Sequence, residues 1–139
     1  MLTLLLAVAA AVQSPGSSPE ESRLIAGAIT ALRPRIVQPG EVRFRRIYFR
    51  TGRGMDGQEH VALCGQMLQD DPRAEAGWTM FIAIELGGEV SVMVGDRGFV
   101  NAAILCRPST TDRWDYSRDF SALFSRELRA GQVAHQSEK

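Results

Sequence analysis

The sequence reads Trp78-Thr-Met-Phe-Ile-Ala-Ile-Glu-Leu86, then Gly87-Gly88, then Glu89-Val-Ser-Val-Met-Val94. Both outer runs are rich in β-branched and large apolar residues, which favour strands. The glycine pair between them is typical of a tight hairpin turn. This stretch therefore predicts an antiparallel hairpin, to which the neighbouring strands must add.

Two more strands are predicted before the hairpin. Val42 to Phe49 alternates apolar side chains with arginines, and the alternation changes phase near Arg45-Arg46. That change indicates either a β-bulge or a strand buried on both faces for part of its length. A glycine-rich loop over 51–57 leads into the next strand, Glu59 to Met67. Because the connections are short, the four strands should form an antiparallel meander.

A helix is predicted before the meander. Ser18, Pro19 and Glu21 have the spacing of an N-terminal capping box with proline in the first turn. The apolar residues that follow recur at helical spacing, and Pro34 should end the helix near Arg33. After the meander, 99–106 is ambiguous between helix and strand, and its shared apolar face favours a short helix. Residues 107–115 should be loop.

A second amphipathic helix is expected from Ser117 to Arg129, with Gly131 at its C-cap and a frayed tail over 132–139. The predicted fold class is thus α+β, an N-terminal helix packed on a four-stranded meander, with a short helix and a C-terminal amphipathic helix, in one domain over 18–131. Nine side chains should be largely buried: Leu24, Ile25, Ile29, Trp78, Met80, Ile82, Ile84, Val90 and Val92.

The N-terminus has the pattern of a signal peptide. Residues 1–11 are uncharged and apolar and end in Ala9-Ala10-Ala11, and the polar residues 12–17 follow as a linker. The run is too short to span a bilayer, and no later run approaches that length. We therefore expect export to the periplasm or beyond, with no transmembrane segment in the mature chain. The alternative is a buried N-terminal element of a cytosolic protein.

The chain has two cysteines, Cys64 and Cys106, which allow one intramolecular pairing. A disulfide would close a loop of about 43 residues, worth roughly 4 kcal/mol in the chain-entropy model. The alternatives are a redox pair or two metal ligands. Because Cys-x-x-Cys is absent and the histidines lack zinc-site spacing, we favour the structural disulfide and expect no metal.

The stretch from 34 to 106 resembles a group of small exported proteobacterial proteins of uncharacterised function. The resemblance is carried by four features: Phe44-Arg45, Leu63-Cys64-Gly65, Gly77-Trp78-Thr79-Met80-Phe81 and the closing Cys106. The chain departs from that group at 66–68, where the group has a Val-Asn pair, and at Ala76, where it has glycine. The resemblance implies an exported, disulfide-closed α+β domain, and it implies no activity.

Several arginines lie along the first predicted strand. They supply the candidate ligand-binding residues Arg43, Arg45 and Arg50. Guanidinium groups pair well with phosphate and carboxylate, so these side chains could bind an anionic lipid or glycan. The alternative is a solvated strand face whose arginines pair with Asp70, Asp71 or Glu75. The chain of 139 residues has a formal net charge of zero, which disfavours nucleic acid as a partner.

Catalytic motifs are sparse. Gly-x-Ser-x-Gly is absent, and the glycine-rich loop lacks the Lys-Ser/Thr of a P-loop. Cys64 with His60 as its base is the remaining candidate pair, yet residues four apart on one strand lie about 13 Å from each other. An enzyme is therefore less favoured than a binding protein, and no cofactor is expected.

Three functions follow in order of preference. The first is a non-catalytic exported module that binds a partner protein or an anionic component of the cell envelope. The second is a small-molecule binder with its pocket between helix and sheet. The third is a small hydrolase.

Overall fold

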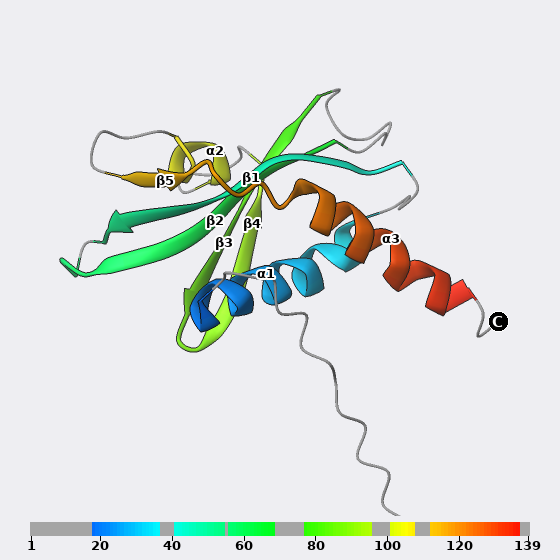
Figure 1. Cartoon of the computed structure of the whole chain (residues 1–139), viewed down its shortest axis with the longest axis horizontal. Helices are drawn as coiled ribbons and strands as arrows, with labels where there is room; N and C mark the ends of the chain where they lie inside the picture. The colour runs from blue at the N-terminus through cyan, green and yellow to red at the C-terminus, as the bar shows by residue number, and fades with distance from the viewer. Residues whose placement is uncertain are drawn as a thin grey trace, which may run out of the picture.

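The fold is a five-stranded antiparallel sheet with helices on both faces, seen in a computed structural model (Figure 1). The structure describes residues 18–36, 41–54, 56–68, 77–95, 101–107 and 112–136, with side chains up to 129. The predicted signal peptide and linker lie outside the described residues. So do Asp70, Asp71 and Glu75, the expected partners of the arginines.

The elements follow one another in a simple order. Helix α1 spans Pro19–Leu32 and continues into a 3-10 turn at Arg33–Arg35. The strands and later helices are β1 (Arg43–Arg53), β2 (Glu59–Leu68), β3 (Thr79–Leu86), β4 (Glu89–Val94), α2 (Ala102–Leu105), β5 (Arg113–Asp115) and α3 (Ser121–Gln136). The strand order in the sheet is β4-β3-β2-β1-β5. Because every neighbouring pair is antiparallel, the predicted meander is confirmed and β5 extends it.

Helix α1 begins as the sequence predicts. The Ser18 hydroxyl accepts a hydrogen bond from the Glu21 backbone N–H (3.2 Å), and Glu21 accepts one from the Ser18 N–H (3.0 Å). The helix then lies close against the sheet, because Gly27 faces β4. A Cβ atom at Gly27 would lie 2.4 Å from the Cβ of Val90, so a larger residue would push the helix off the sheet.

The C-terminal third differs from the prediction in two places. Residues 113–115, expected in a loop, form β5 and pair with Phe49, Arg50 and Thr51 of β1. Three residues are too few to show a strand period. Helix α3 begins at Ser121 instead of Ser117 and continues past Gly131 to Gln136. Phe120, the residue just before the helix, donates its N–H to the Ile47 carbonyl of β1 (3.0 Å).

The sheet has an apolar cluster on each face. The larger cluster joins α1 and α3 to one face of the sheet, and Phe81 and Ala83 are its β3 members. The smaller cluster lies on the opposite face, where α2, the short helix expected within 99–106, covers Ile82 and the cysteines. Figure 1 shows this layering, with α1 and α3 on one side of the strands and α2 on the other.

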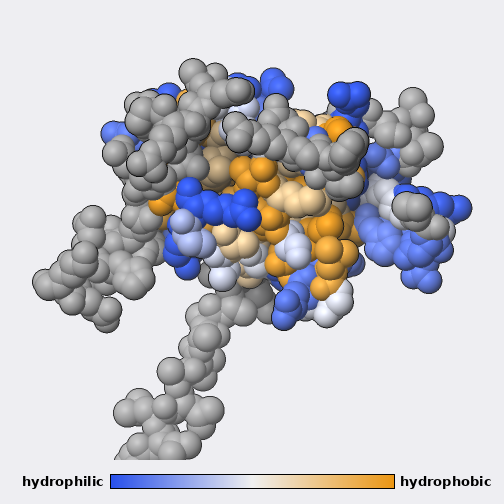
Figure 2. Space-filling view, turned by 180° about the vertical axis from the view of Figure 1, so that it is seen from behind, coloured by the Kyte–Doolittle hydropathy of each residue, from blue (hydrophilic) through white to orange (hydrophobic). Residues whose placement is uncertain are grey.

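The predicted core was therefore partly wrong. Leu24, Ile25, Ile29 and Ile82 are buried. Five others are only partly buried: Trp78, Met80, Ile84, Val90 and Val92. Helix α2 is too short to cover the whole sheet face on its side, and β4, which carries the two valines, is an edge strand. Figure 2, which views the molecule from behind relative to Figure 1, shows apolar side chains gathered near the centre of that view.

Candidate functional site: a cavity on the sheet face opposite α1

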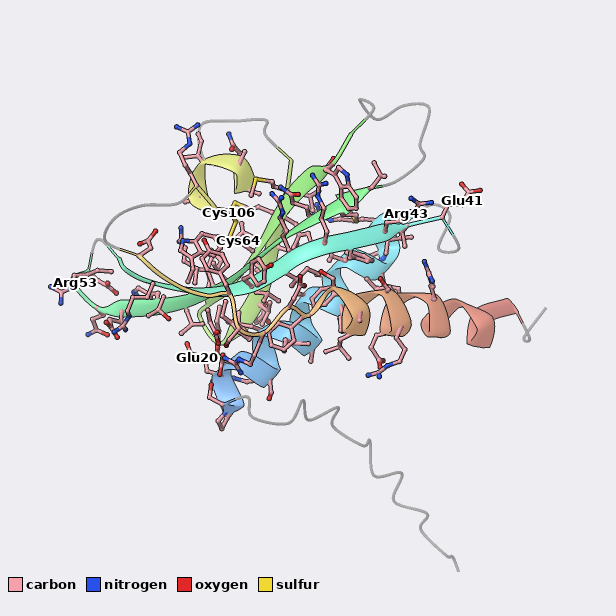
Figure 3. All side chains as sticks on the ribbon, turned by 45° about the horizontal axis from the view of Figure 1, so that its top comes forward. Glu20, Glu41, Arg43, Arg53, Cys64 and Cys106 are labelled. Atoms are coloured by element: carbon pink, nitrogen blue, oxygen red, sulfur yellow. A yellow bond between two sulfur atoms is a disulfide. The ribbon has the colours of Figure 1, made fainter. Side chains whose placement is uncertain are left out.

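The predicted disulfide joins β2 to the segment that follows α2. The Cα atoms of Cys64 and Cys106 lie 5.8 Å apart, and both residues are buried. Figure 3 shows the pair on the side of the sheet away from α1. Both sulfur atoms are in the bond, so Cys64 has no thiolate to act as a nucleophile. The form of the hydrolase hypothesis that relied on Cys64 and His60 is therefore excluded.

The change of phase in β1 is a β-bulge. Arg45 pairs with Gln66, the next paired residue is Tyr48 with Cys64, and two residues of β1 thus lie opposite Gly65. Arg46, the first of those two, has φ 53° and is the only non-glycine residue with a positive φ in the described chain. Such a backbone costs about 1–2 kcal/mol for a residue with a Cβ, so the surrounding contacts must hold it in place.

Asp119 holds the bulge from the side of α3. Its carboxylate accepts a hydrogen bond from the Ile47 N–H at 3.3 Å and another from the Ser121 N–H at 2.9 Å. Burial by itself would raise the pKa of Asp119, but the hydrogen bonds from Ser121, Ile47 and Tyr48 outweigh it and keep the pKa below its ordinary value. The carboxylate is thus charged at neutral pH, and its contribution to stability is lost only as the pH falls through that lowered pKa.

A cavity of about 360 Å³ lies above this part of the sheet. The bulge and the disulfide contribute to its lining, and residues of β3, β5 and the turn after β5 complete the wall. The lining residues are Arg46, Tyr48, Cys64, Gly65, Gln66, Met80, Cys106, Trp114 and Tyr116. None of them is acidic, and Arg46 is the one cation. The predicted alternative placed a pocket between helix and sheet, whereas this cavity lies on the face opposite α1.

The three arginines proposed as ligand-binding residues have different environments. Arg43 is exposed near one end of β1, away from the cavity lining (Figure 3). Arg45 is half-buried, its guanidinium lies 4.0 Å from the centre of the Trp78 ring, and its Nε donates to Gln66 Oε1 at 2.6 Å. The sequence predicted one exposed basic face, and the structure gives no such face among the described residues of β1.

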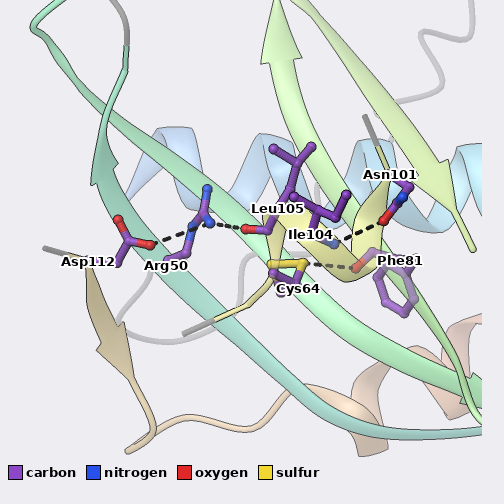
Figure 4. Close-up of a disulfide and its surroundings, with 8 residues drawn as sticks. Arg50, Cys64, Phe81, Asn101, Ile104, Leu105 and Asp112 are labelled. Atoms are coloured by element: carbon purple, nitrogen blue, oxygen red, sulfur yellow. Dashed lines mark hydrogen bonds and ion pairs between the residues drawn. A yellow bond between two sulfur atoms is a disulfide. The ribbon is translucent and has the colours of Figure 1, made fainter. Parts of the chain in front are cut away.

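Arg50 holds the cavity wall instead of facing solvent. Its Nη1 lies 3.5 Å from Asp112 Oδ2 and also donates to the Leu105 carbonyl (Figure 4). The side chains of Arg50 and Asp112 are only 19% and 13% exposed. The pair therefore links β1 to the segments before β5 and at the end of α2, which leaves Arg50 unsuited to bind a ligand.

Arg46 is the residue that sequence analysis missed as a site residue. Its side chain is exposed at the cavity and makes no ion pair within the described part of the chain. The change of phase at Arg45-Arg46 was the available signal, because a bulge redirects the side chain at that position. The direction in which the bulge turns the Arg46 side chain depends on the backbone angles, and these could not be inferred from the sequence.

A second cavity of about 340 Å³ lies near the start of α1. Its charged side chains are largely paired: Arg118 Nη2 lies 2.7 Å from Glu21 and 2.8 Å from Asp115. Arg118 also lies against the rings of Phe49 and Phe120. This network connects α1, β5 and the start of α3, and we assign it a structural role.

Other features add no further site. The described residues hold no group of three or more His, Cys, Asp or Glu side chains placed to share a metal ion. Among the same residues, no helix is long and apolar enough to cross a bilayer. Comparison with family models, with curated proteins and with solved structures found no match to the chain.

The strain at Arg46 leads to a prediction about stability. Arg46→Gly should raise the free energy of unfolding by up to about 1 kcal/mol, because glycine adopts the left-handed region without steric cost. Arg43→Gly, on the same strand, should lower the free energy of unfolding by about 0.5–1 kcal/mol. Urea unfolding of both variants measures the difference. An equal loss of stability in both would show that the backbone at position 46 is not strained.

Proposed function

We propose that the protein is a non-catalytic module that binds a small anionic ligand, carrying an apolar body, in the cavity beside the bulge. The observation that carries this proposal is the lining: among the described residues it holds one guanidinium, that of Arg46, no carboxylate, and walls that include aromatic rings and Met80. An arginine at a cavity with apolar walls favours an anionic ligand, because a ligand seated there excludes part of the water and its charge-assisted hydrogen bonds become stronger.

The volume and shape support a small ligand better than a polymer. Ligand pockets have volumes of about 300–1,000 Å³ and combine apolar walls with few polar groups. The cavity has this character, whereas Arg50 and Arg45 are already engaged with protein partners. A polyanionic glycan or lipid surface would need several free arginines side by side, which the described part of β1 does not present.

Export remains part of the proposal. A buried disulfide persists in oxidising compartments, and Cys64–Cys106 is such a bond. It supports a protein that works in the periplasm or outside the cell, on a small anionic component of that environment. The resemblance to small exported proteins points the same way.

The test is equilibrium binding of two small anions, phenylacetate and phenylphosphate, with phenylethanol as the neutral probe. Trp114 lines the cavity, so its fluorescence should report occupancy. The wild-type protein should bind at least one anion more tightly than the neutral probe. Arg46→Gln should weaken that binding about tenfold or more, the loss of one charge-assisted contact.

Arg43→Gln is the matched control, because it removes the same charge from the same strand outside the cavity. It should leave the affinity within about twofold, as expected for an exposed charge screened by water. The proposal fails if neither anion binds, if the neutral probe binds as tightly, or if both variants lose affinity equally.

A further inference from the structure

We infer that Gln66 and Arg46 together select a monocarboxylate attached to a flat aromatic body. The inference rests on the proposed function and names the ligand class of the same cavity. It depends on how Gln66 is oriented, on the charge of the lining, and on the kinds of side chain in the wall.

Gln66 has one possible orientation of its amide group. Arg45 Nε, which can only donate, lies 2.6 Å from Gln66 Oε1. Arg45 is itself held by the Trp78 ring, whose centre lies 4.0 Å from the guanidinium carbon. The carbonyl end of Gln66 is thus occupied, and its NH2 group is left with two donors at a residue that lines the cavity. Trp78 and Arg45 act as positioning residues for this amide.

Arg46 supplies the second donor group from the neighbouring strand. Arg46 comes directly after Arg45, which pairs with Gln66 across the two strands. The Arg46 guanidinium and the Gln66 amide therefore belong to the neighbouring strands β1 and β2, at the position of the bulge. A carboxylate has two oxygens, of which one can accept a hydrogen bond from the Arg46 guanidinium and the other from the Gln66 amide. Arg46 and Gln66 thus both offer donors at the cavity, which disfavours a cationic ligand.

The charge of the lining distinguishes a carboxylate from a phosphate. Within the part of the chain that the structure describes, the lining has one cation and no acid, so a ligand with one negative charge would be neutralised. A phosphate monoester carries about −1.5 to −2 charges at pH 7 and would leave part of its charge uncompensated in a partly enclosed site.

The walls favour a flat ring as the body of the ligand. Tyr48 and Tyr116 meet edge to face with ring centres 5.0 Å apart, and Trp114 is stacked parallel to Tyr116 at 5.8 Å. Met80 adds a polarizable side chain to the wall. Aromatic rings pack favourably on both kinds of surface. The cavity is near the small end of the range for ligand pockets, which suits one or two rings.

The decisive experiment compares four probes on the wild-type protein and on Gln66→Glu by titration calorimetry. The probes are phenylacetate, phenylphosphate, phenylacetamide and hexanoate. The wild-type protein should bind phenylacetate at least tenfold more tightly than each of the others. The introduced carboxylate would keep the contact to Arg45 but offer acceptors instead of donors. The affinity of the variant for phenylacetate should therefore be at least tenfold lower than that of the wild-type protein, and its affinity for phenylacetamide should be higher.

The outcomes separate the inference from the proposed function. If the wild-type protein binds phenylacetate and phenylphosphate with equal affinity, the preference for a carboxylate is overturned. If it binds hexanoate as tightly as phenylacetate, the preference for an aromatic ring is overturned. Unchanged probe preference in folded Gln66→Glu would overturn the role of Gln66. In each of these cases, binding that depends on Arg46 would leave the proposed function standing. If no anion binds the wild-type protein, both fail. The wild-type preferences need no variant, so the test does not depend on the folding of Gln66→Glu.

Discussion

Phe81→Ala is expected to lower the free energy of unfolding by about 3–5 kcal/mol, the range for a fully buried phenylalanine. Phe81 has no exposed surface, its ring is stacked on Phe124 at 5.8 Å, and Phe44 meets it edge to face at 6.4 Å. The change would leave a void where β3, β1 and α3 meet. Equilibrium unfolding in urea or guanidinium chloride measures the loss.

Leu86→Ala is the matched control for that change, because Leu86 lies on the same strand and is 59% exposed. Its effect should stay within about 0.5 kcal/mol. A loss under about 1 kcal/mol for Phe81→Ala would contradict the assignment of this β3 face to the core between sheet and helices.

Removing the disulfide in the double variant Cys64→Ala, Cys106→Ala is expected to cost about 2–5 kcal/mol. Part of the cavity wall should be lost with it. Helix α2 has four residues, and a helix that short has no stability of its own. Without the disulfide, the segment would depend on the hydrogen bond from Arg50 to the Leu105 carbonyl and on that from the Ala102 N–H to the Gly95 carbonyl.

Thermal unfolding with and without a reductant checks this expectation. The reductant should lower the melting temperature of the wild-type protein and leave that of the double variant unchanged, because the variant has no bond to reduce. Equal melting temperatures for the oxidised wild-type protein and the double variant would show that the bond contributes little to the fold.

Local signals in the sequence were sufficient for the first half of the fold. Helix α1 begins at the predicted capping box because its contacts join residues three apart. The hairpin of β3 and β4 was also visible as a local pattern, and the change of phase in β1 left a bulge as one of two alternatives. The disulfide was predictable for a different reason, since two cysteines leave only one pairing.

Contacts between distant residues were not predictable in the same way. Asp112 pairs with Arg50, far away along the chain, and nothing near Asp112 in the sequence indicates this partner. Strand β5 exists because β1 offers it a free edge, and Phe120, just before α3, bonds to Ile47 of β1.

The prediction also assigned the wrong face of β3 to the helices: it chose the face of Met80, Ile82 and Ile84. Phe81 and Ala83 pack with α1 and α3 instead. Both faces are apolar, so the local pattern could not distinguish them.

The candidate site was likewise predictable only where it depends on local sequence patterns. The sequence showed that arginines cluster on β1, but the structure separates them into an exposed Arg43, a stacked Arg45, a largely buried Arg50 and Arg46 at the cavity. The cavity itself depends on β5 and on the disulfide-linked segment, which meet only in the folded chain. A bulge at position 46 was therefore one of two predicted alternatives, and a binding role for Arg46 was not predicted.

The most direct test of the central claim is an NMR titration of the wild-type protein with phenylacetate. Binding in the cavity should produce saturable shifts at the Trp114 indole N–H, the Gln66 side-chain NH2 and the backbone amides of Arg46 and Gly65. The amides of α1, on the opposite face of the sheet, should not move. Shifts confined to α1 or to the Arg43 end of β1, or the absence of saturable shifts, would contradict the claim that this cavity binds a small anion.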